Sequence, residues 1–337
     1  MGDNLNLTFD SSTSVGFRYE NMLCILVLLV TIIGIPGTIV TMRFYGKRIK
    51  KSSTSTALYL SALAVFDMLS LLSNIPGIAL EMSMSILDEE NAIAAYFTRI
   101  PKYWSNLTLL LVGIERVVSV VLPHKAPYIF TRRVGTVSVI VIIVIAPVVL
   151  LPLAIEPPLV AVTTNGTITH VRRKVQMLLD PDVYRSLIQI VSVLYFGIPV
   201  FGVFISNICL VTLLYGRFKS KRARNIRDTM TSQQVRELRT TKLIMLVTVI
   251  FIICVLPLVI IYPVISISGE PIPIQTLLVI HPMSSLLESL NYSMNVVVYF
   301  FGSSNFRTET RQMLSRVCGC CRHTTRTTTV TPETKTQ

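Results

Sequence analysis

Ionisable and amide side chains interrupt several long apolar stretches of this sequence. Asp67 lies within the second stretch, the pair Glu115-Arg116 ends the third, and Asn291 and Asn295 lie in the last. Such side chains are costly in hydrocarbon unless they face protein or water, so they mark candidate functional sites. A carboxylate in that setting needs a cation, a proton or several hydrogen bonds, because desolvation penalises its charged form.

Helical spacing brings several of these residues together. Four polar residues of the last stretch are three and four positions apart and share one helical face: Glu288, Asn291, Asn295 and Tyr299. Ser105 precedes Arg116 by 11 residues, about 16 Å of helix, and so lies at mid-membrane as Asp67 does. We therefore expect one polar cluster at a common depth, made of Asp67, Ser105, Asn291 and Asn295.

Composition places the chain among membrane proteins. Of its 337 residues, 51% are hydrophobic and 15% are charged, with a mean hydropathy of +0.62, whereas a water-soluble domain carries about 25% charged residues. Seven apolar stretches have the length needed to cross a bilayer: 22–45, 56–80, 95–121, 134–155, 186–215, 239–265 and 275–301. The predicted fold is an all-α membrane protein, a seven-transmembrane helix bundle.

Basic residues indicate the orientation of the bundle. Of the 31 Lys and Arg residues, 23 lie in four stretches, 43–51, 124–133, 217–242 and 307–335. Basic loops stay in the cytoplasm, so the amino terminus is expected to be extracellular. The net charge of +13 does not indicate a nucleic-acid partner, because the charges flank apolar stretches and interleave with no aromatic platform. They can also contact anionic membrane lipid.

The chain divides into four parts by this pattern. Residues 1–20 are expected to form an extracellular amino-terminal segment and 21–302 the seven-helix domain. Residues 303–317 are expected to form a short amphipathic helix parallel to the membrane, and 318–337 a disordered cytoplasmic tail, since the tail is polar and Thr-rich.

Several residues are candidates for covalent modification. Sequons at Asn6 and Asn165 fall on the predicted outer side, where they can be glycosylated. Three membrane-proximal cysteines follow the amphipathic stretch: Cys318, Cys320 and Cys321. They suit S-palmitoylation, with a zinc site or no modification as alternatives. Only Cys24 lies near the outer face, so no extracellular disulfide is expected.

The polar pattern resembles that of rhodopsin-like (class A) G-protein-coupled receptors over nearly the whole chain. The matching features are Asp67, Glu115-Arg116, Phe251-x-x-Cys254-x-x-Pro257 and the run Asn291 to Tyr299. The resemblance implies a multi-pass plasma-membrane receptor that activates a heterotrimeric G protein, with arrestin and receptor kinases as further partners. The chain is also similar to invertebrate receptors for FMRFamide-type neuropeptides, which implies a peptide ligand. A class A receptor for a non-peptide ligand is the alternative, and a membrane transporter a more distant one.

The resemblance assigns seven residues to signalling: Glu115, Arg116, Asn207, Glu237, Phe251, Pro257 and Tyr299. In such receptors an Arg to Glu bridge between the third and sixth spans holds the resting state. Glu237 lies 20 residues before Pro257, about 30 Å of helix, at the cytoplasmic end where Arg116 lies. The alternative is two unconnected interfacial charges. Pro257 removes a helical hydrogen bond and provides a hinge.

The resemblance also implies that the cluster around Asp67 holds an allosteric sodium ion, and no other cofactor is expected. Oxygen ligands with one carboxylate suit a hard cation. The alternative is an interhelical hydrogen-bond cluster without an ion.

Eight residues near the outer ends of the spans are candidates for ligand binding: Glu81, Thr98, Arg99, Lys102, Tyr103, His281, Ser285 and Glu288. Thr98 lies where amine receptors place an Asp, and Ser289 where opsins place the retinal-bearing Lys, so a monoamine or retinal is disfavoured. Glu288 can meet the cationic group of an amidated peptide through charge-assisted hydrogen bonds. It can also pair with Lys102 across the bundle, and the two interpretations are compatible.

The chain departs from the family pattern at several positions. Asn91 replaces the cysteine that usually tethers an outer loop, and the other departures are Thr38, Val117, Asn207, Val255 and Val296. An enzyme is not predicted, because the four histidines lie in loops, span ends or the tail without matching partners. No internal repeat of the kind found in transporters is present in the sequence.

Overall fold

The computed structural model describes residues 11–49, 55–82, 91–154, 159–164, 167–173, 180–223, 232–268 and 272–317. The predicted modification sites lie outside the described residues: Asn6, Asn165, Cys318, Cys320 and Cys321. The side chains of Glu81 and Glu237 also lie outside the described part, although both positions fall within helices.

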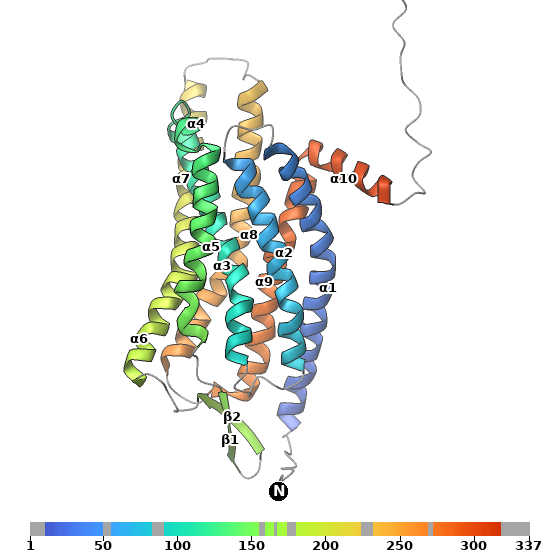
Figure 1. Cartoon of the computed structure of the whole chain (residues 1–337), viewed down its shortest axis with the longest axis vertical. Helices are drawn as coiled ribbons and strands as arrows, with labels where there is room; N and C mark the ends of the chain where they lie inside the picture. The colour runs from blue at the N-terminus through green and yellow to red at the C-terminus, as the bar shows by residue number, and fades with distance from the viewer. Residues whose placement is uncertain are drawn as a thin grey trace, which may run out of the picture.

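Long helices run side by side along the molecule and form the bundle that the sequence predicts (Figure 1). They are α1 (Ser11–Ile49), α2 (Thr56–Met82), α3 (Asn91–Val121), α5 (Arg132–Ala154), α7 (Ile198–Ala223), α8 (Ser232–Ser268) and α9 (Ile274–Gly302). A π-helical turn, η2 (Val193–Gly197), joins α6 (Pro181–Ser192) to α7, so these three elements form one rod. The short helix α4 (Ala126–Ile129) connects α3 and α5. Helix α1 begins at Ser11, inside the segment predicted to precede the bundle.

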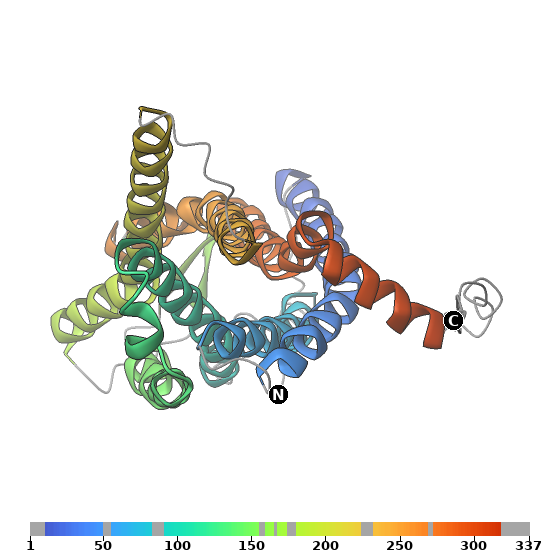
Figure 2. The same cartoon turned by 90° about the horizontal axis from the view of Figure 1, so that it is seen from above.

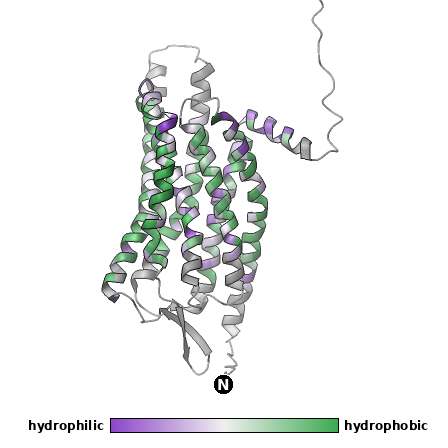
Figure 3. Ribbon diagram, in the orientation of Figure 1, coloured by the Kyte–Doolittle hydropathy of each residue, from purple (hydrophilic) through white to green (hydrophobic). Residues whose placement is uncertain are grey.

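Six of the described helical spans are long and apolar enough to cross a membrane: Asn21–Ile49, Thr56–Pro76, Tyr96–Val121, Arg132–Ala154, Ser186–Gly216 and Thr240–Ile261. Apolar residues dominate these rods in Figure 3, and hydrophilic residues gather on α10. Helix α9 is the seventh rod, and Ser284, Ser289, Asn291 and Asn295 on it are buried. Its polar face is therefore covered by the other helices, as expected of a polar span inside a bundle.

A small antiparallel sheet lies at the same end of the bundle as the start of α1 (Figure 1). Strands β1 (Leu159–Thr164) and β2 (Thr167–Arg173) pair with Leu159 opposite Arg173, and β2 pairs with β3 (Ile272–Pro273). The sequence between β1 and β2 is Asn165-Gly166, a pair that two-residue hairpin loops favour. The all-α prediction holds for the bundle, and this loop sheet is an addition that it did not include.

Helix α10 (Ser304–Val317) follows the last rod, which agrees with the predicted helix at 303–317. It projects away from the bundle when seen from above (Figure 2). Phe306 anchors its start, because this fully buried ring lies 4.9 Å from the ring of Phe44 and 6.0 Å from that of Tyr299. The ammonium of Lys47 also pairs with the carboxylate of Glu309, which ties α10 to the end of α1.

Glycines allow α1 to lie close against α9. A Cβ atom built on Gly37 would lie 2.5 Å from Cγ1 of Val296, and one on Gly34 would lie 2.3 Å from Oγ of Ser293. Small residues at helix interfaces are the usual means by which membrane helices approach closely.

We expect Gly37→Ala to lower the stability of the purified protein by about 1–3 kcal/mol, the usual cost of overpacking. The β-branched Val296 has one preferred rotamer in a helix and cannot easily move aside. The midpoint of thermal unfolding in detergent measures the effect. Gly216→Ala is the matched control, because a Cβ there meets nothing within 4 Å. Equal midpoints for the two variants would contradict close packing at Gly37.

Candidate functional site

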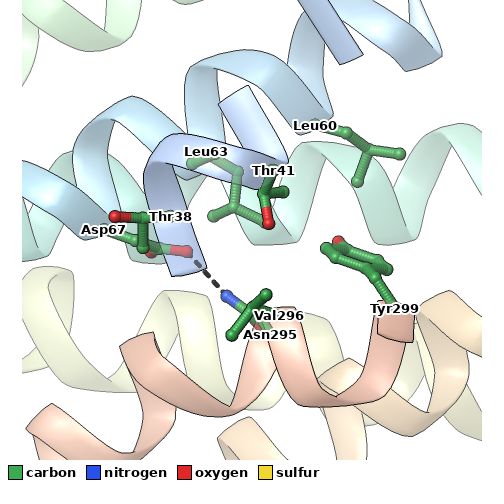
Figure 4. A pocket seen from close by; sticks show the side chains of 9 residues that line it. Thr38, Thr41, Leu60, Leu63, Asp67, Asn295, Val296 and Tyr299 are labelled. Carbon is green, nitrogen blue, oxygen red and sulfur yellow. Dashed lines mark hydrogen bonds between the residues drawn. The ribbon is translucent and has the colours of Figure 1, made fainter. Parts of the chain in front are cut away.

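A carboxylate joins three helices near the middle of the bundle. Asp67 on α2 has only 1% of its surface exposed. Ser105 on α3 donates a hydrogen bond to its Oδ1 at 2.5 Å. Asn295 on α9 donates one from Nδ2 to its Oδ2 at 2.7 Å, the bond drawn as a dashed line in Figure 4. The structure thus brings together three of the four residues predicted for this cluster.

Asn291 is the fourth predicted member, and the structure places it differently. It is buried and lies one helical turn from Asn295. Within the described residues, the hydrogen bonds to Asp67 come from Ser105 and Asn295 and not from Asn291. Four residues, about 6 Å of helix, therefore separate Asn291 along α9 from the residue that contacts the carboxylate.

A narrow pocket with no room for a water molecule adjoins Asp67 (Figure 4), and its wall includes Thr38 and Thr41 of α1. Both hydroxyls donate to carbonyls of their own helix, Thr38 to Ile35 at 2.9 Å and Thr41 to Gly37 at 3.0 Å, so their oxygen lone pairs remain able to accept. Carboxylate, hydroxyl and amide oxygens form a ligand set that suits a hard cation rather than a transition metal. In the described part of the chain, no three His, Cys, Asp or Glu side chains gather as metal ligands.

An ion pair joins α3 and α9 nearer the end of the bundle that carries the loop sheet. Nζ of Lys102 lies 2.5 Å from Oε2 of Glu288, and the two side chains are only 12% and 14% exposed. Lys102 precedes Ser105 by three residues on α3, so the pair lies about one helical turn, roughly 5 Å, from the Asp67 cluster. The predicted pairing of these residues across the bundle is therefore present.

The other residues predicted to bind the ligand, where their side chains are described, differ in how deeply they are buried. Tyr103 is buried, and its hydroxyl donates to the carbonyl of Leu194 in the π-helical turn at 3.0 Å. Its ring lies 5.2 Å from that of Tyr195. Four further candidates are partly buried: Thr98, Arg99, His281 and Ser285.

A second charge cluster lies at the opposite end of α3. Glu115 is 1% exposed, and its Oε1 accepts hydrogen bonds from Ser55 at 3.0 Å and from Thr56 at 2.6 Å. Nη2 of Arg116 donates to Oγ1 of Thr56 and lies 3.6 Å from Oε1 of Glu115. The pair Glu115-Arg116 is thus tethered to the start of α2, and among the described residues Oε2 of Glu115 has no hydrogen-bond partner.

Four other predicted signalling residues are buried or partly buried. Phe251 on α8 is fully buried, Pro257 is partly buried, and the ring of Tyr299 lies 5.4 Å from that of Tyr45. Asn207 on α7 accepts a hydrogen bond at its Oδ1 from Thr248 on α8 at 2.7 Å.

Sequence reasoning did not single out several polar residues that complete these clusters. Ser55 and Thr56 hold Glu115, and Asn74 on α2 donates to Ser289 on α9 at 2.9 Å. The sequence could have identified Asn74, because it lies seven residues, about two helical turns, after Asp67 on the same face. Ser55 and Thr56 could have been noted as hydroxyls at the start of a span.

Comparison with known proteins yields one family. The sequence model described as "7 transmembrane receptor (rhodopsin family)" matches residues 37–299, more than three-quarters of the chain. The matched range contains all three polar clusters described above. Comparison with curated protein sequences gives no match.

Proposed function

The chain belongs to the rhodopsin family of seven-transmembrane receptors, and on that premise we propose that it binds an extracellular ligand and activates a heterotrimeric G protein. The observation that carries this proposal is the arrangement of polar clusters along α3. One helix carries Lys102 near the loop sheet, Ser105 at mid-bundle and Arg116 at the opposite end. Lys102 contacts α9, whereas Ser105 and Arg116 contact α2, so the contacts of α3 extend from one end of the molecule to the other.

In this proposal, ligand binding at the outer end and G-protein binding at the inner face are linked by a coupling free energy. A ligand that competes for Glu288 would release Lys102 and change how α9 lies against α3. Helix α9 also holds Asp67 through Asn295, so the change would reach the central cluster. At the inner end, the outward swing of α8 about Pro257 would follow release of Arg116 from its resting partners.

The proposed orientation places the loop sheet and the amino terminus outside the plasma membrane. The basic stretches at 43–51, 124–133 and 307–335 then face the cytoplasm, as the distribution of Lys and Arg predicts. Asn6 and Asn165 would be glycosylated outside, and Cys318, Cys320 and Cys321 would be palmitoylated inside. The cytoplasmic face would contact the G protein and, after phosphorylation by receptor kinases, arrestin.

The proposed ligand is an amidated peptide of the FMRFamide type, with a non-peptide ligand as the alternative. The Lys102–Glu288 pair supports a cationic ligand, because an arginine forms bidentate charge-assisted bonds to a carboxylate and can displace a lysine from it. The acidic residues Glu81 and Glu288 belong to the same end of the bundle. A peptide arginine therefore has a matching anion in the pocket.

The direct test of the proposed function is guanine-nucleotide exchange. Purified protein in lipid nanodiscs is mixed with heterotrimeric G proteins of each class, and GTP-analogue uptake is measured with and without a library of amidated peptides. Acceleration by one G-protein class, lost in Arg116→Ala, is the expected result. Exchange that is unaltered by the protein in every class would contradict coupling to G proteins.

Sodium should stabilise the wild-type protein through Asp67. At a sodium concentration ten times the dissociation constant, binding to the folded state adds about 1.4 kcal/mol to stability. The unfolding midpoint should therefore rise when sodium replaces a bulky organic cation at equal ionic strength. Asp67→Asn should abolish the rise, since it removes the only formal charge of the cluster. A midpoint that is equal in the two salts for the wild type would leave the cluster as a hydrogen-bond network alone.

A further inference from the structure

Helix α9 ends in a glycine that lies very close to α8. A Cβ atom built on Gly302 would lie 1.8 Å from Cδ2 and 3.1 Å from Cγ of Leu243, well inside the roughly 3.5–4.0 Å of ordinary carbon–carbon contact. Gly302 belongs to the helix, and its φ lies outside the left-handed region. The close approach of Leu243, rather than an unusual backbone conformation, therefore accounts for a glycine at this position.

Leu243 cannot avoid such a Cβ by a rotation about χ2. That rotation moves Cδ2, but Cγ keeps its place and would remain 3.1 Å from the Cβ, still closer than ordinary contact. A rotation about χ1 would carry the whole side chain, and Leu243 packs against the main hydrophobic core, whose close packing resists that change. A side chain at position 302 therefore requires the two helices to separate.

Helix α9 lies between α8 and α1 when the bundle is seen from above (Figure 2). On the α1 side, a Cβ built on Gly37 would lie 2.5 Å from Cγ1 of Val296. Tyr299, one turn before Gly302, has its ring centroid 5.4 Å from that of Tyr45 on α1. Because α1 leaves α9 no room to retreat, α8 is the helix that a side chain at position 302 would displace.

Leu243 lies near the inner end of α8. It precedes Pro257 by 14 residues, about 21 Å of helix, and the proposed function has α8 swinging outward about that proline. Bringing Cδ2 into ordinary contact with a Cβ at position 302 requires a displacement of about 2 Å. At about 21 Å from the proline, a rotation of about 5° supplies that displacement. Full contact between Leu243 and Gly302 therefore requires α8 to be in its inward position.

We propose that Gly302 and Leu243 are positioning residues that set the resting position of α8, with the leucine seated in the space that the missing Cβ leaves. The inference rests on the proposed activation of a G protein by outward movement of α8. A side chain at position 302 holds α8 away from α9 and favours the outward state. The contact is apolar, so it acts separately from the charges of Glu115 and Arg116.

Spin labels on α5 and α8 measure this displacement without a G protein. The full chain in lipid nanodiscs carries a spin-labelled unnatural amino acid at Arg133 and another at Lys242, both exposed positions. We expect Gly302→Ala to raise the ratio of outward to inward label distances about tenfold, because overpacking penalises only the inward state. Basal uptake of a GTP analogue by added heterotrimeric G protein should rise by a similar factor.

A size exchange between the two residues tests their contact directly. In the double variant Gly302→Ala/Leu243→Ala, the new methyl group occupies space that the leucine has left. Its outward population and its basal uptake of GTP analogue should therefore fall well below those of Gly302→Ala. If Gly302→Ala does not reach the membrane, Leu243→Phe enlarges the inserted side chain instead and should move the labels in the same direction.

Two other glycine variants separate a displacement of α8 from a general loss of stability. Gly37→Ala also overpacks a helix contact, but it does so between α1 and α9. It should lower the unfolding midpoint without moving the labels. Gly216→Ala should change neither quantity, because a Cβ there meets nothing within 4 Å.

Unchanged label distances in both Gly302→Ala and Leu243→Phe would overturn the proposal. A double variant displaced as far as Gly302→Ala would overturn it as well, because the leucine would then play no part. A shift of the labels without a rise in GTP-analogue uptake would support the contact and contradict the proposed coupling to G proteins instead. The two proposals can therefore fail separately.

Discussion

Replacing Lys102 by Met should destabilise the purified receptor by about 3–5 kcal/mol, because the change leaves the Glu288 carboxylate buried without its cation. The ammonium and carboxylate lie 2.5 Å apart, and both side chains are more than 85% buried. Glu288→Leu should cost a similar amount by leaving the ammonium unpaired. The midpoint of thermal unfolding in detergent, or in nanodiscs, measures each loss.

The double variant Lys102→Met/Glu288→Leu decides whether the pair acts as a unit. Replacing a buried pair by apolar residues of similar volume is often neutral, so the double variant should recover most of the stability. Lys47→Met is the control, because it breaks a pair with Glu309 in which the lysine is 62% exposed and should cost less than about 1 kcal/mol. A double variant whose loss of stability equals the sum of the two single losses would show that the residues are not coupled.

The same double variant also separates stability from ligand recognition. If Glu288 receives the cationic group of the ligand, a stable double variant should reach the cell surface yet lose its response to the activating peptide. A normal response would exclude Glu288 from ligand recognition without affecting its role in packing.

Neutralising Glu115 should raise ligand-independent signalling about tenfold, the effect of a shift of about 1.4 kcal/mol between two receptor states. In Glu115→Gln the hydroxyls of Ser55 and Thr56 can still donate to the amide oxygen, but the charge that attracts Arg116 is gone. Arg116 is then held near α2 only by Thr56 and is released more easily. Basal second-messenger output at matched surface expression measures the effect.

Two further charge variants show whether the rise in basal signalling comes from the Glu115-Arg116 pair. Glu309→Gln is the matched control, because its carboxylate pairs with an exposed lysine away from α3. If basal output rises equally in Glu309→Gln and Glu115→Gln, a general change in charge or expression is responsible. Arg116→Ala should instead weaken coupling, since the proposed G-protein contact includes Arg116.

The Arg116–Glu237 bridge makes an independent prediction. Glu237→Ala should also raise basal output, because the outward-swung state does not need that pair. Equal basal output from wild type and Glu237→Ala would exclude this bridge, while an effect of Glu115→Gln would still support the tether to α2.

Much of the bundle could be predicted because membrane crossing imposes length and polarity on every span. The apolar stretch predicted at 134–155 and helix α5 differ by only two residues at its start. Depth along a helix follows from residue counting, so the meeting of Asp67, Ser105 and Asn295 and the pairing of Lys102 with Glu288 were both predictable.

Rotation of one helix against another could not be predicted in the same way. Residue counting places Asn291 and Asn295 one turn apart on one face of α9, but which of the two bonds to Asp67 depends on how α9 lies against α2. The bonds from Ser55 and Thr56 to Glu115 join residues about 60 positions apart, and no local pattern specifies them. The π-helical turn has a similar origin, because an apolar run at 186–215 fits a regular helix equally well.

The π-helical turn η2 determines how far α6 is rotated about the helix axis relative to α7. A π-helical turn accommodates one residue more than an α-helical turn, and one residue corresponds to about 100° of rotation. The hydroxyl of Tyr103 on α3 donates a hydrogen bond to the carbonyl of Leu194 in this turn. This bond therefore holds α6 and α7 at one relative rotation. If the turn tightened to an α-helix, α6 would rotate by one residue relative to α7, and a different ring of the Tyr195-Phe196 pair would face Tyr103. The length of this one turn therefore decides which aromatic ring the fifth span presents to α3.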